Sequence, residues 1–154
     1  MDVVQAKFCS KIDLSNAYKQ VCIEPEDMHK TTFAMVYRMC KSNIMQQGDC
    51  NAPATFQQLM TIIFQDVIGI FVHVYLDNLF IFSSSIEEHE KHLEYVFEKL
   101  CKYYLFLEKE KCDLYSKSMD CLGHLINDQG LHTDVDKMAH VHNWQTPRNL
   151  KKVQ

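Results

Sequence analysis

The stretch VYLDNLFIF, at residues 74–82, constrains the fold more than any other part of this sequence. It closes a β-rich, largely apolar run over residues 70–82, and it contains the polar pair Asp77 and Asn78. The run is too long for one ordinary strand, so we predict a β-hairpin that bends at the polar pair. A carboxylate in apolar surroundings is costly unless something pairs with it, which makes Asp77 a candidate functional residue.

On either side of this hairpin the sequence predicts an amphipathic helix. The first follows Asn51, which is expected to cap it, and Gly69 is expected to end it. The second begins at Ser85, because Ser85 and Glu88 form a capping box. Apolar residues at helical spacing are expected to form the buried faces: Phe56, Leu59, Met60, Ile63 and Phe64 in the first helix, and Leu93, Val96, Phe97, Leu100 and Tyr104 in the second.

The remaining pattern is mostly β-prone. Strands are predicted at residues 8–13, 18–24, 31–37, 112–115 and 121–126. The sequence NDQG predicts a turn, and a last helix is expected to begin at Thr133 or Asp134 and to stop at Pro147. This order, a meander followed by alternating helices and strands, indicates an α+β fold with a mostly antiparallel sheet.

Composition narrows the function classes. A chain of 154 residues with 47% hydrophobic residues can bury the core of one domain, and its net charge of −4 argues against a free-standing nucleic-acid binder. The seven cysteines form no Cys-x-x-Cys pair, so we expect reduced, mostly buried thiols in a cytoplasmic or nuclear protein that is not secreted. The apolar run is too short to span a bilayer, so no membrane contact is expected.

Two aspartates at strand ends are the main candidates for chemistry. Asp13, in KIDLSNAY, ends one predicted strand, and Asp77 lies at the hairpin bend. A single buried Asp is often only a turn former, but a pair suits a hard cation such as Mg²⁺. A zinc site at His89 and His92 is disfavoured, because their spacing does not match the zinc-protease motif, so a solvated helix face is expected.

Several blocks occur in an order that carries a family resemblance. They are FCSKIDLSNAYKQVCIEPEDMHKTTF, NAPATFQQLM, VYLDNLFIFSSSIEEHEKHLEYVFEKL, LEKEKCDLYSKSMDCLGHLI and GLHTD. Together they resemble the reverse transcriptase of gypsy-type LTR retrotransposons over residues 8–154. The resemblance implies a polymerase palm, an antiparallel sheet backed by helices with incomplete fingers, over residues 1–132, and the start of a thumb-like segment over residues 133–154.

The same resemblance implies roles for residues around the two aspartates. YLDN falls on the family's Tyr-x-Asp-Asp bend, so Asp13, Asp77 and Asn78 are implied to be catalytic, with Asp13 and Asp77 as ligands of two Mg²⁺ ions. Leu14 and Tyr18 are implied to bind the nucleotide. Tyr18 would lie beneath the sugar of the incoming nucleotide and disfavour a ribose 2′-hydroxyl.

A primer site and nucleic-acid partners are implied as well. Leu122, Gly123 and His124 fall where the family's primer-binding hairpin lies. The implied partners are an RNA or DNA template-primer and a deoxynucleoside triphosphate. The basic fingers, the complete thumb, the connection and the ribonuclease H domain are expected outside the present sequence.

Departures from the family pattern leave two hypotheses. Asn78 replaces the second Asp of the bend and removes one negative charge, and residues 45–49, MQQGD, lose the family's Pro and Phe. The first hypothesis is a reverse transcriptase palm with impaired catalysis. The second is a non-catalytic relic, or a palm retained as a binding or scaffold module. Exposed apolar palm surface would also favour self-association.

Overall fold

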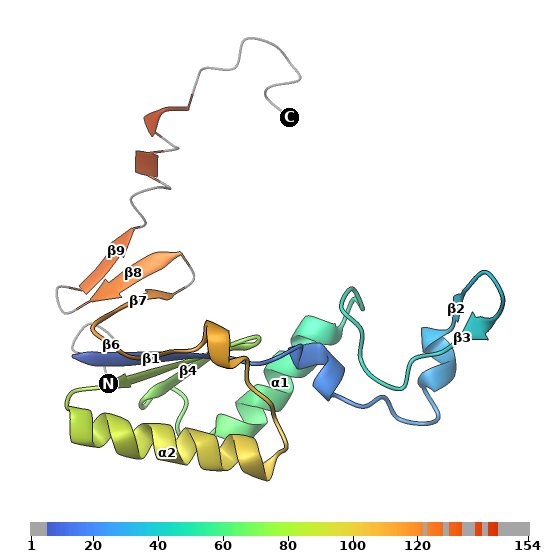
Figure 1. Ribbon diagram of the computed structural model, residues 1–154, viewed down its shortest axis with the longest axis horizontal. Helices are drawn as coiled ribbons and strands as arrows, with labels where there is room; N and C mark the ends of the chain where they lie inside the picture. Colours follow the sequence, from blue (N-terminus) through green and yellow to red (C-terminus); the bar gives the residue numbers. More distant parts are fainter. Residues whose placement is uncertain (1–5, 122, 128–129, 134–137, 140–141, 145–154) are drawn as a thin grey trace.

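The computed structural model describes residues 6–121, 123–127, 130–133, 138–139 and 142–144. Its centre is an antiparallel sheet with the strand order β4-β5-β1-β6 (Figure 1). These strands are β1 (Phe8–Asp13), β4 (Val72–Tyr75), β5 (Asn78–Ser83) and β6 (Asp113–Ser116). The predicted hairpin at residues 70–82, the strand at residues 8–13 and the α+β class with an antiparallel sheet are therefore confirmed.

The central strand β5 is buried on both faces, which explains the apolar run at its residues 79–82. On one face, Leu79 and Ile81 pack into a core built with the two helices α1 (Ala52–Phe64) and α2 (Ile86–Lys102). On the other face, Phe80 and Phe82 pack against Met119 and Ile126, which belong to a second sheet. In Figure 1, α2 lies below the central sheet, α1 runs obliquely from below the sheet to its right-hand side, and the second sheet lies above.

Helix α1 carries the predicted apolar stripe, and four of its members, Phe56, Met60, Ile63 and Phe64, are buried. Asn51 stands at the cap position, but no side-chain capping bond is found there among the described residues. The prediction that Gly69 ends the helix is wrong, because the helix ends at Phe64. The Phe64 carbonyl accepts the N–H groups of Val67 and Ile68, so the chain turns early and Val67 packs into the core.

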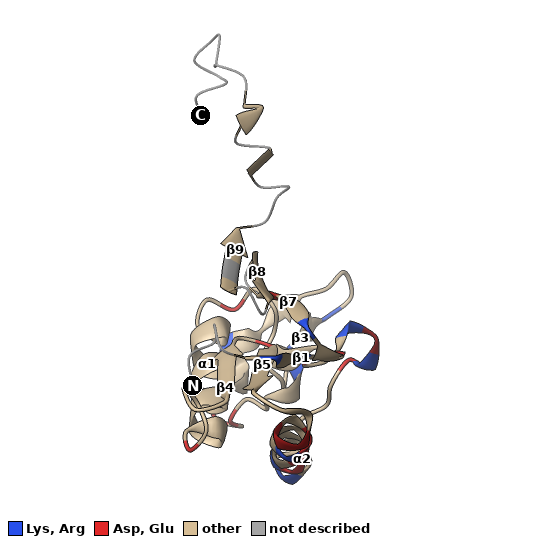
Figure 2. Cartoon of the chain, turned by 90° about the vertical axis from the view of Figure 1, so that its left-hand side faces the viewer, with Lys and Arg blue, Asp and Glu red and all other residues tan. Residues whose placement is uncertain are grey.

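Helix α2 begins as predicted, because the Ser85 hydroxyl accepts the N–H of Glu88 at 3.2 Å. Leu93, Val96 and Leu100 are buried, and charged residues cover the outer face (Figure 2). The prediction that Tyr104 belongs to the buried stripe is wrong. It lies beyond the end of the helix with a φ of +55° and is 81% exposed, because the chain leaves the helical path before it.

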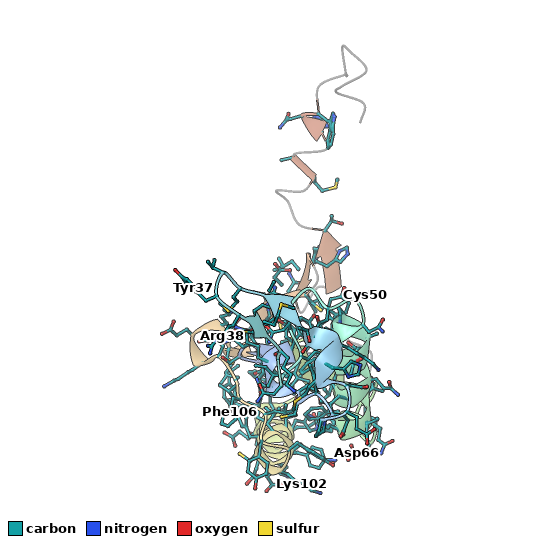
Figure 3. All side chains as sticks on the ribbon, turned by 90° about the vertical axis from the view of Figure 1, so that its right-hand side faces the viewer. Tyr37, Arg38, Cys50, Asp66, Lys102 and Phe106 are labelled. Atoms are coloured by element: carbon teal, nitrogen blue, oxygen red, sulfur yellow. The ribbon has the colours of Figure 1, made fainter. Side chains whose placement is uncertain are left out.

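The strands predicted at residues 18–24 and 31–37 are wrong in most of their length. Short 3₁₀ turns form instead at η2 (Ala17–Gln20) and η3 (Met28–Thr31). Only the brief pair β2 (Phe33–Ala34) and β3 (Met39–Cys40) remains. This hairpin projects from the body of the molecule and joins no larger sheet among the described strands, so its apolar side chains stay exposed (Figure 1). Figure 3 shows Tyr37 and Arg38 at its outer edge, and Tyr37 is 96% exposed.

The second sheet has the antiparallel order β7-β8-β9. Its strands are β7 (Ser118–Cys121), β8 (His124–Asn127) and β9 (Gly130–Thr133). The predicted last helix and most of the segment 133–154 lie outside the described residues. No helix in the described part of the chain is long and apolar enough to cross a membrane.

The expectation of mostly buried cysteines is wrong, although all seven are free. Only Cys9, in the middle of the central sheet, is buried. Cys22 and Cys50 lie in exposed loops, and Cys101 lies on the open face of α2 near its end. A small apolar side chain at these positions has no core to enter.

Candidate active site

The bend between β4 and β5 places Asp77 beside the end of β1. Tyr75 pairs with Asn78 as the last register pair of the hairpin, and Asp13 pairs with Asn78 across β1 and β5. The N–H of Leu14 donates to the carbonyl of Asp77 at 2.9 Å. Two aspartates that are far apart in sequence thereby meet at one edge of the sheet.

Helix α1 supports this bend through Gln57. Leu76 has a φ of +52°, a strained value for a residue with a branched side chain. The Leu76 N–H donates to Oε1 of Gln57 at 2.8 Å, and Nε2 of Gln57 donates to the carbonyl of Val74 at 3.3 Å. Gln57 thus binds the backbone on the β4 side of the bend at Val74 and at Leu76 itself. These two bonds stabilise the strained conformation of Leu76 and the position of the next residue, Asp77.

Asp13 and Asp77 open onto one polar cavity of about 210 Å³. The other residues that line it are Leu14, Asn16, Ala17, Tyr18, Lys19, Gln47 and Lys111. The two carboxylates, Leu14 and Tyr18, for which the resemblance implies nucleotide binding, and two lysines therefore share a single site. Sequence reasoning missed Lys19, Gln47 and Lys111.

Lys111 places its ammonium group close to the carboxylate of Asp13. Its Nζ lies 3.8 Å from Oδ1 of Asp13, whose side chain is 14% exposed, whereas the Lys111 side chain is 65% exposed. Because the lysine is largely in solvent and the separation is long, this pair contributes little to stability. Lys111 ends the exposed turn η4 (Lys109–Lys111), which the N–H of Glu108 ties to the carbonyl of Asp13 at 2.8 Å. Local sequence gave no signal for this approach, because KEK is typical of a solvated turn.

Tyr18 reaches the cavity from the 3₁₀ turn η2 rather than from the predicted strand. Its ring packs edge-on against Phe56 of α1, with centroids 5.7 Å apart and planes at 88°. Asn16, at a φ of +47°, reverses the chain just before the turn. The ring is thus held against the core, and Tyr18 also lines the site.

Asn78 behaves differently from the two aspartates. Its Nδ2 donates to Oδ1 of Asp77 at 2.9 Å. Its own Oδ1 is buried and has no hydrogen-bond partner among the described residues. Within that part of the chain, the cavity lining includes Asp77 but not Asn78.

The implied primer residues lie in the second sheet. Gly123 has a φ of +76° in the tight turn between β7 and β8, and its N–H donates to Oδ1 of Asp120 at 3.0 Å. His124 begins β8 and is exposed. Leu122 lies outside the described residues. The contacts of these residues with a primer stay a prediction.

The expectation of a solvated histidine face on α2 is wrong. His89 is fully buried, and its ring nitrogens lie 2.7 Å from Oγ of Ser10 and 2.8 Å from Oγ of Ser83. His92 is partly buried, with its ring stacked on Phe71 at 3.7 Å between centroids. Burial, with a smaller contribution from His92, lowers the pKa of His89.

The donor set in the cavity fits a hard divalent cation. Mg²⁺ is usually held by one or two carboxylates together with waters and substrate phosphates, and Asp13 and Asp77 supply such a pair in an open polar site. No group of three or more His, Cys, Asp or Glu side chains in the described residues is arranged to hold a metal ion. This arrangement favours an Mg²⁺ site completed by substrate over a closed structural zinc site.

Comparisons with known proteins agree with this geometry. A family model described as "Reverse transcriptase (RNA-dependent DNA polymerase)" matches residues 2–126. The chain is 30% identical over 149 residues to the retrovirus-related Pol polyprotein from transposon 297 of Drosophila melanogaster, covering 97% of the chain and 14% of that protein. It is also 30% identical over 144 residues to the Tf2-7 polyprotein of Schizosaccharomyces pombe, covering 94% of the chain and 11% of that protein. The chain thus spans only a small part of these relatives.

Solved structures show the same likeness. The foamy viral protease-reverse transcriptase in complex with double-stranded DNA matches with a TM-score of 0.87 and 27% identity, over 97% of this chain and 26% of that one. The same viral protein in complex with an RNA/DNA hybrid matches with a TM-score of 0.83 and 25% identity, over 100% of this chain and 22% of that one.

Proposed function

Because this chain belongs to the reverse transcriptase (RNA-dependent DNA polymerase) family, we propose that it forms the palm of a retrotransposon polymerase and carries part of the centre for template-directed DNA synthesis. The observation that supports this most is the meeting of Asp13 and Asp77 at one sheet edge, in a cavity that Tyr18 also lines. Residues 1–132 would make up the palm, and residues 133–154 would begin a thumb.

The proposed reaction is nucleotidyl transfer. The primer 3′-hydroxyl gives up its proton to solvent and its oxygen forms a bond to the α-phosphorus of the nucleotide, while the bond from that phosphorus to the bridging oxygen breaks to release pyrophosphate. Mg²⁺, when bound, supplies positive charge that activates the 3′-hydroxyl and stabilises the transferring phosphate. Asp13 and Asp77 would hold the cation, and Lys19 and Lys111 place positive charge at the cavity wall where a triphosphate would lie.

Partners follow from the same proposal. The two foamy viral structures compared above are complexes with double-stranded DNA and with an RNA/DNA hybrid, which supports an RNA or DNA template-primer as the partner of this chain. The turn at Gly123 and the exposed His124 would contact the primer, together with Leu122. The free cysteines suit a reducing compartment, so we place the protein in the cytoplasm or the nucleus.

We also propose that catalysis by this chain is impaired. Asn78 leaves two carboxylates where the family places three, so one negative charge is missing beside the cation site. At about 4 Å and an effective dielectric near 20, one charge is worth roughly 4 kcal/mol of Coulomb energy, part of which desolvation offsets. A net loss of about 1.4 kcal/mol would already lower the rate or the cation occupancy tenfold.

The second candidate function is a non-catalytic binding or scaffold module. Asn78 favours it, and so does the apolar hairpin β2–β3, whose Val36 is 91% exposed and could support self-association. Under this alternative the palm would retain the fold and the nucleic-acid surface but not the chemistry.

Primer extension on an RNA template with Mg²⁺ tests the proposal. The chain, its Asn78→Asp variant and its Asp13→Asn variant are assayed alone and after fusion to the fingers and thumb of a related polymerase. We expect extension from the fused Asn78→Asp protein and none from the fused Asp13→Asn protein. Absence of extension from every fused protein would favour the scaffold function. Robust extension by the unmodified chain of 154 residues would contradict the proposed impairment.

A further inference from the structure

Asn78 occupies the position beside Asp77, but the two ends of its amide have different surroundings. The nitrogen donates to Oδ1 of Asp77 at 2.9 Å. The oxygen is buried and has no hydrogen-bond partner in the described part of the chain. Asparagine can ligate a hard cation only through its oxygen, and that atom is buried in a residue that does not line the cavity within the described part of the chain.

The orientation of this amide is set by charge. Turning the group over would place its oxygen about as close to Oδ1 of Asp77 as the nitrogen lies now, at 2.9 Å, and two acceptor atoms repel each other at that distance. The N–H therefore faces the carboxylate even though the oxygen loses a partner. A hydrogen bond to a charged acceptor is stronger than one between neutral groups, which offsets the unpaired oxygen.

The backbone of Asn78 leaves little freedom for another arrangement. Asn78 is the first residue of β5 and is paired on one side with Asp13 and on the other with Tyr75. The pairing fixes the backbone of Asn78 beside Asp77, and the 2.9 Å hydrogen bond holds the amide there. Within the described residues it does not line the cavity that Asp13 and Asp77 share.

We propose that Asn78 is a positioning residue that orients the carboxylate of Asp77 for a divalent cation and does not itself bind the cation. The N–H holds one oxygen of Asp77, which leaves the other oxygen for the cavity. Hydrogen bonds of this kind to a metal-binding side chain typically change metal affinity 10–100-fold. This inference rests on the proposed function and deepens it, since it assigns Asn78 a role different from that of the aspartate it replaces.

Mn²⁺ binding in the absence of nucleotide tests the role, with free Mn²⁺ measured by electron paramagnetic resonance. The wild-type chain is compared with Asn78→Ala, with Asp77→Asn as the variant that removes a ligand, and with Asn43→Ala as a control for loss of an exposed amide. We expect Asp77→Asn to abolish binding and Asn43→Ala to leave it unchanged. Asn78→Ala should weaken Mn²⁺ binding about tenfold without removing a charge. The metal-free thermal midpoint of Asn78→Ala should stay close to that of the wild type, as a merely structural role would not predict.

A second measurement on the wild-type protein does not depend on the folding of any variant at Asn78. The side-chain carbonyl carbon of Asn78 is followed by nuclear magnetic resonance during titration with Mg²⁺. We expect its shift to change little, whereas direct ligation through the oxygen would move it strongly and overturn the proposal. Mn²⁺ affinity that is lost in Asp77→Asn but unchanged in Asn78→Ala would also overturn it and leave the cation site intact. No Mn²⁺ binding by the wild type would overturn both the positioning role and the cation site of the proposed function.

Discussion

Ser10 and His89 lie 79 residues apart in the chain, yet Oγ of Ser10 is 2.7 Å from Nε2 of His89 and both residues are fully buried. Ser10 Oγ also accepts the N–H of Tyr115 at 3.0 Å, so its own hydrogen can point at Nε2. The ring proton of a neutral His89 then lies on Nδ1, facing Oγ of Ser83 at 2.8 Å. Ser83 in turn meets Nδ1 of His92 at 2.8 Å, so the network joins α2 to β1 and β5.

This network predicts that the protein loses stability on acidification. Burial is the largest cause that lowers the pKa of both His89 and His92 below the ordinary value of 6.5; Glu88 opposes the shift at His92. The unfolded chain therefore binds more protons than the folded one below about pH 6.5, and the free energy of unfolding should fall as pH falls through that value. Each ring that stays neutral in the fold contributes a slope of at most about 1.4 kcal/mol per pH unit.

Urea unfolding between about pH 5 and pH 8 checks this dependence. The groups that face His89 are His92 on α2 and the Tyr115 ring on β6, with the neutral hydroxyls of Ser10 and Ser83 on the sheet. The variant His89→Gln should flatten the curve, and His29→Gln, at an exposed position, should not. An identical curve for His89→Gln and wild type would contradict the assignment.

Loss of the Ser83 hydroxyl should destabilise the protein more than loss of its exposed neighbour Ser84. Ser83→Ala leaves a nitrogen on each of two imidazole rings without its partner, which should cost about 1–3 kcal/mol. Ser84→Ala removes only an exposed bond to Glu88 and should cost about 0.5 kcal/mol or less. Equal free energies of unfolding for the two variants would show that the buried hydroxyl is dispensable.

The parts of the fold that were predicted correctly from the sequence are those that depend on residues close together in the chain. The bend at Asp77 and the cap at Ser85 are two such features, and the structure confirms both. Burial of His89 depends on Ser10, a strand residue far away in sequence, so the charged pattern HEKH suggested solvent instead. In the same way, the sequence KEK indicated a solvated turn, and only the folded structure shows that Lys111 lies near Asp13.

The wrong strands have a related cause. Residues 18–24 alternate between apolar and polar side chains, but a strand also needs a neighbour to pair with. Here only an isolated bridge forms, between Cys22 and Ile44. Gln20 instead bonds to the carbonyl and the N–H of Phe106, at 2.9 and 2.8 Å, and so ties the turn η2 to the loop after α2. These contacts are visible only in three dimensions.

Replacing Asn78 with aspartate should make stability depend more strongly on Mg²⁺. Asn78→Asp exchanges an N–H donor for a carboxylate next to Asp77, and two like charges in contact oppose each other. The metal-free thermal midpoint should therefore fall, and Mg²⁺ should raise it by more than it does in the wild type. The double variant Asp77→Asn with Asn78→Asp, which restores a single carboxylate at the bend, should lose most of this response. If Mg²⁺ left the thermal midpoint of Asn78→Asp unchanged, this result would contradict a cation site at the bend.

The last prediction concerns the floor of the cavity. Tyr18 is fixed from behind by its edge-on contact with Phe56, so its ring cannot retreat when a nucleotide enters. If the sugar lies over this ring, an added 2′-hydroxyl meets it, and Tyr18→Val should lower the discrimination against ribonucleotides about tenfold or more. Tyr18→Phe keeps the ring and should preserve the discrimination, which separates the size of the side chain from its hydroxyl. The measurement is the ratio of kcat/KM for deoxynucleotide and ribonucleotide incorporation, made in the Asn78→Asp protein fused to fingers and thumb. Equal ratios for Tyr18→Val and its parent would show that another residue selects the sugar.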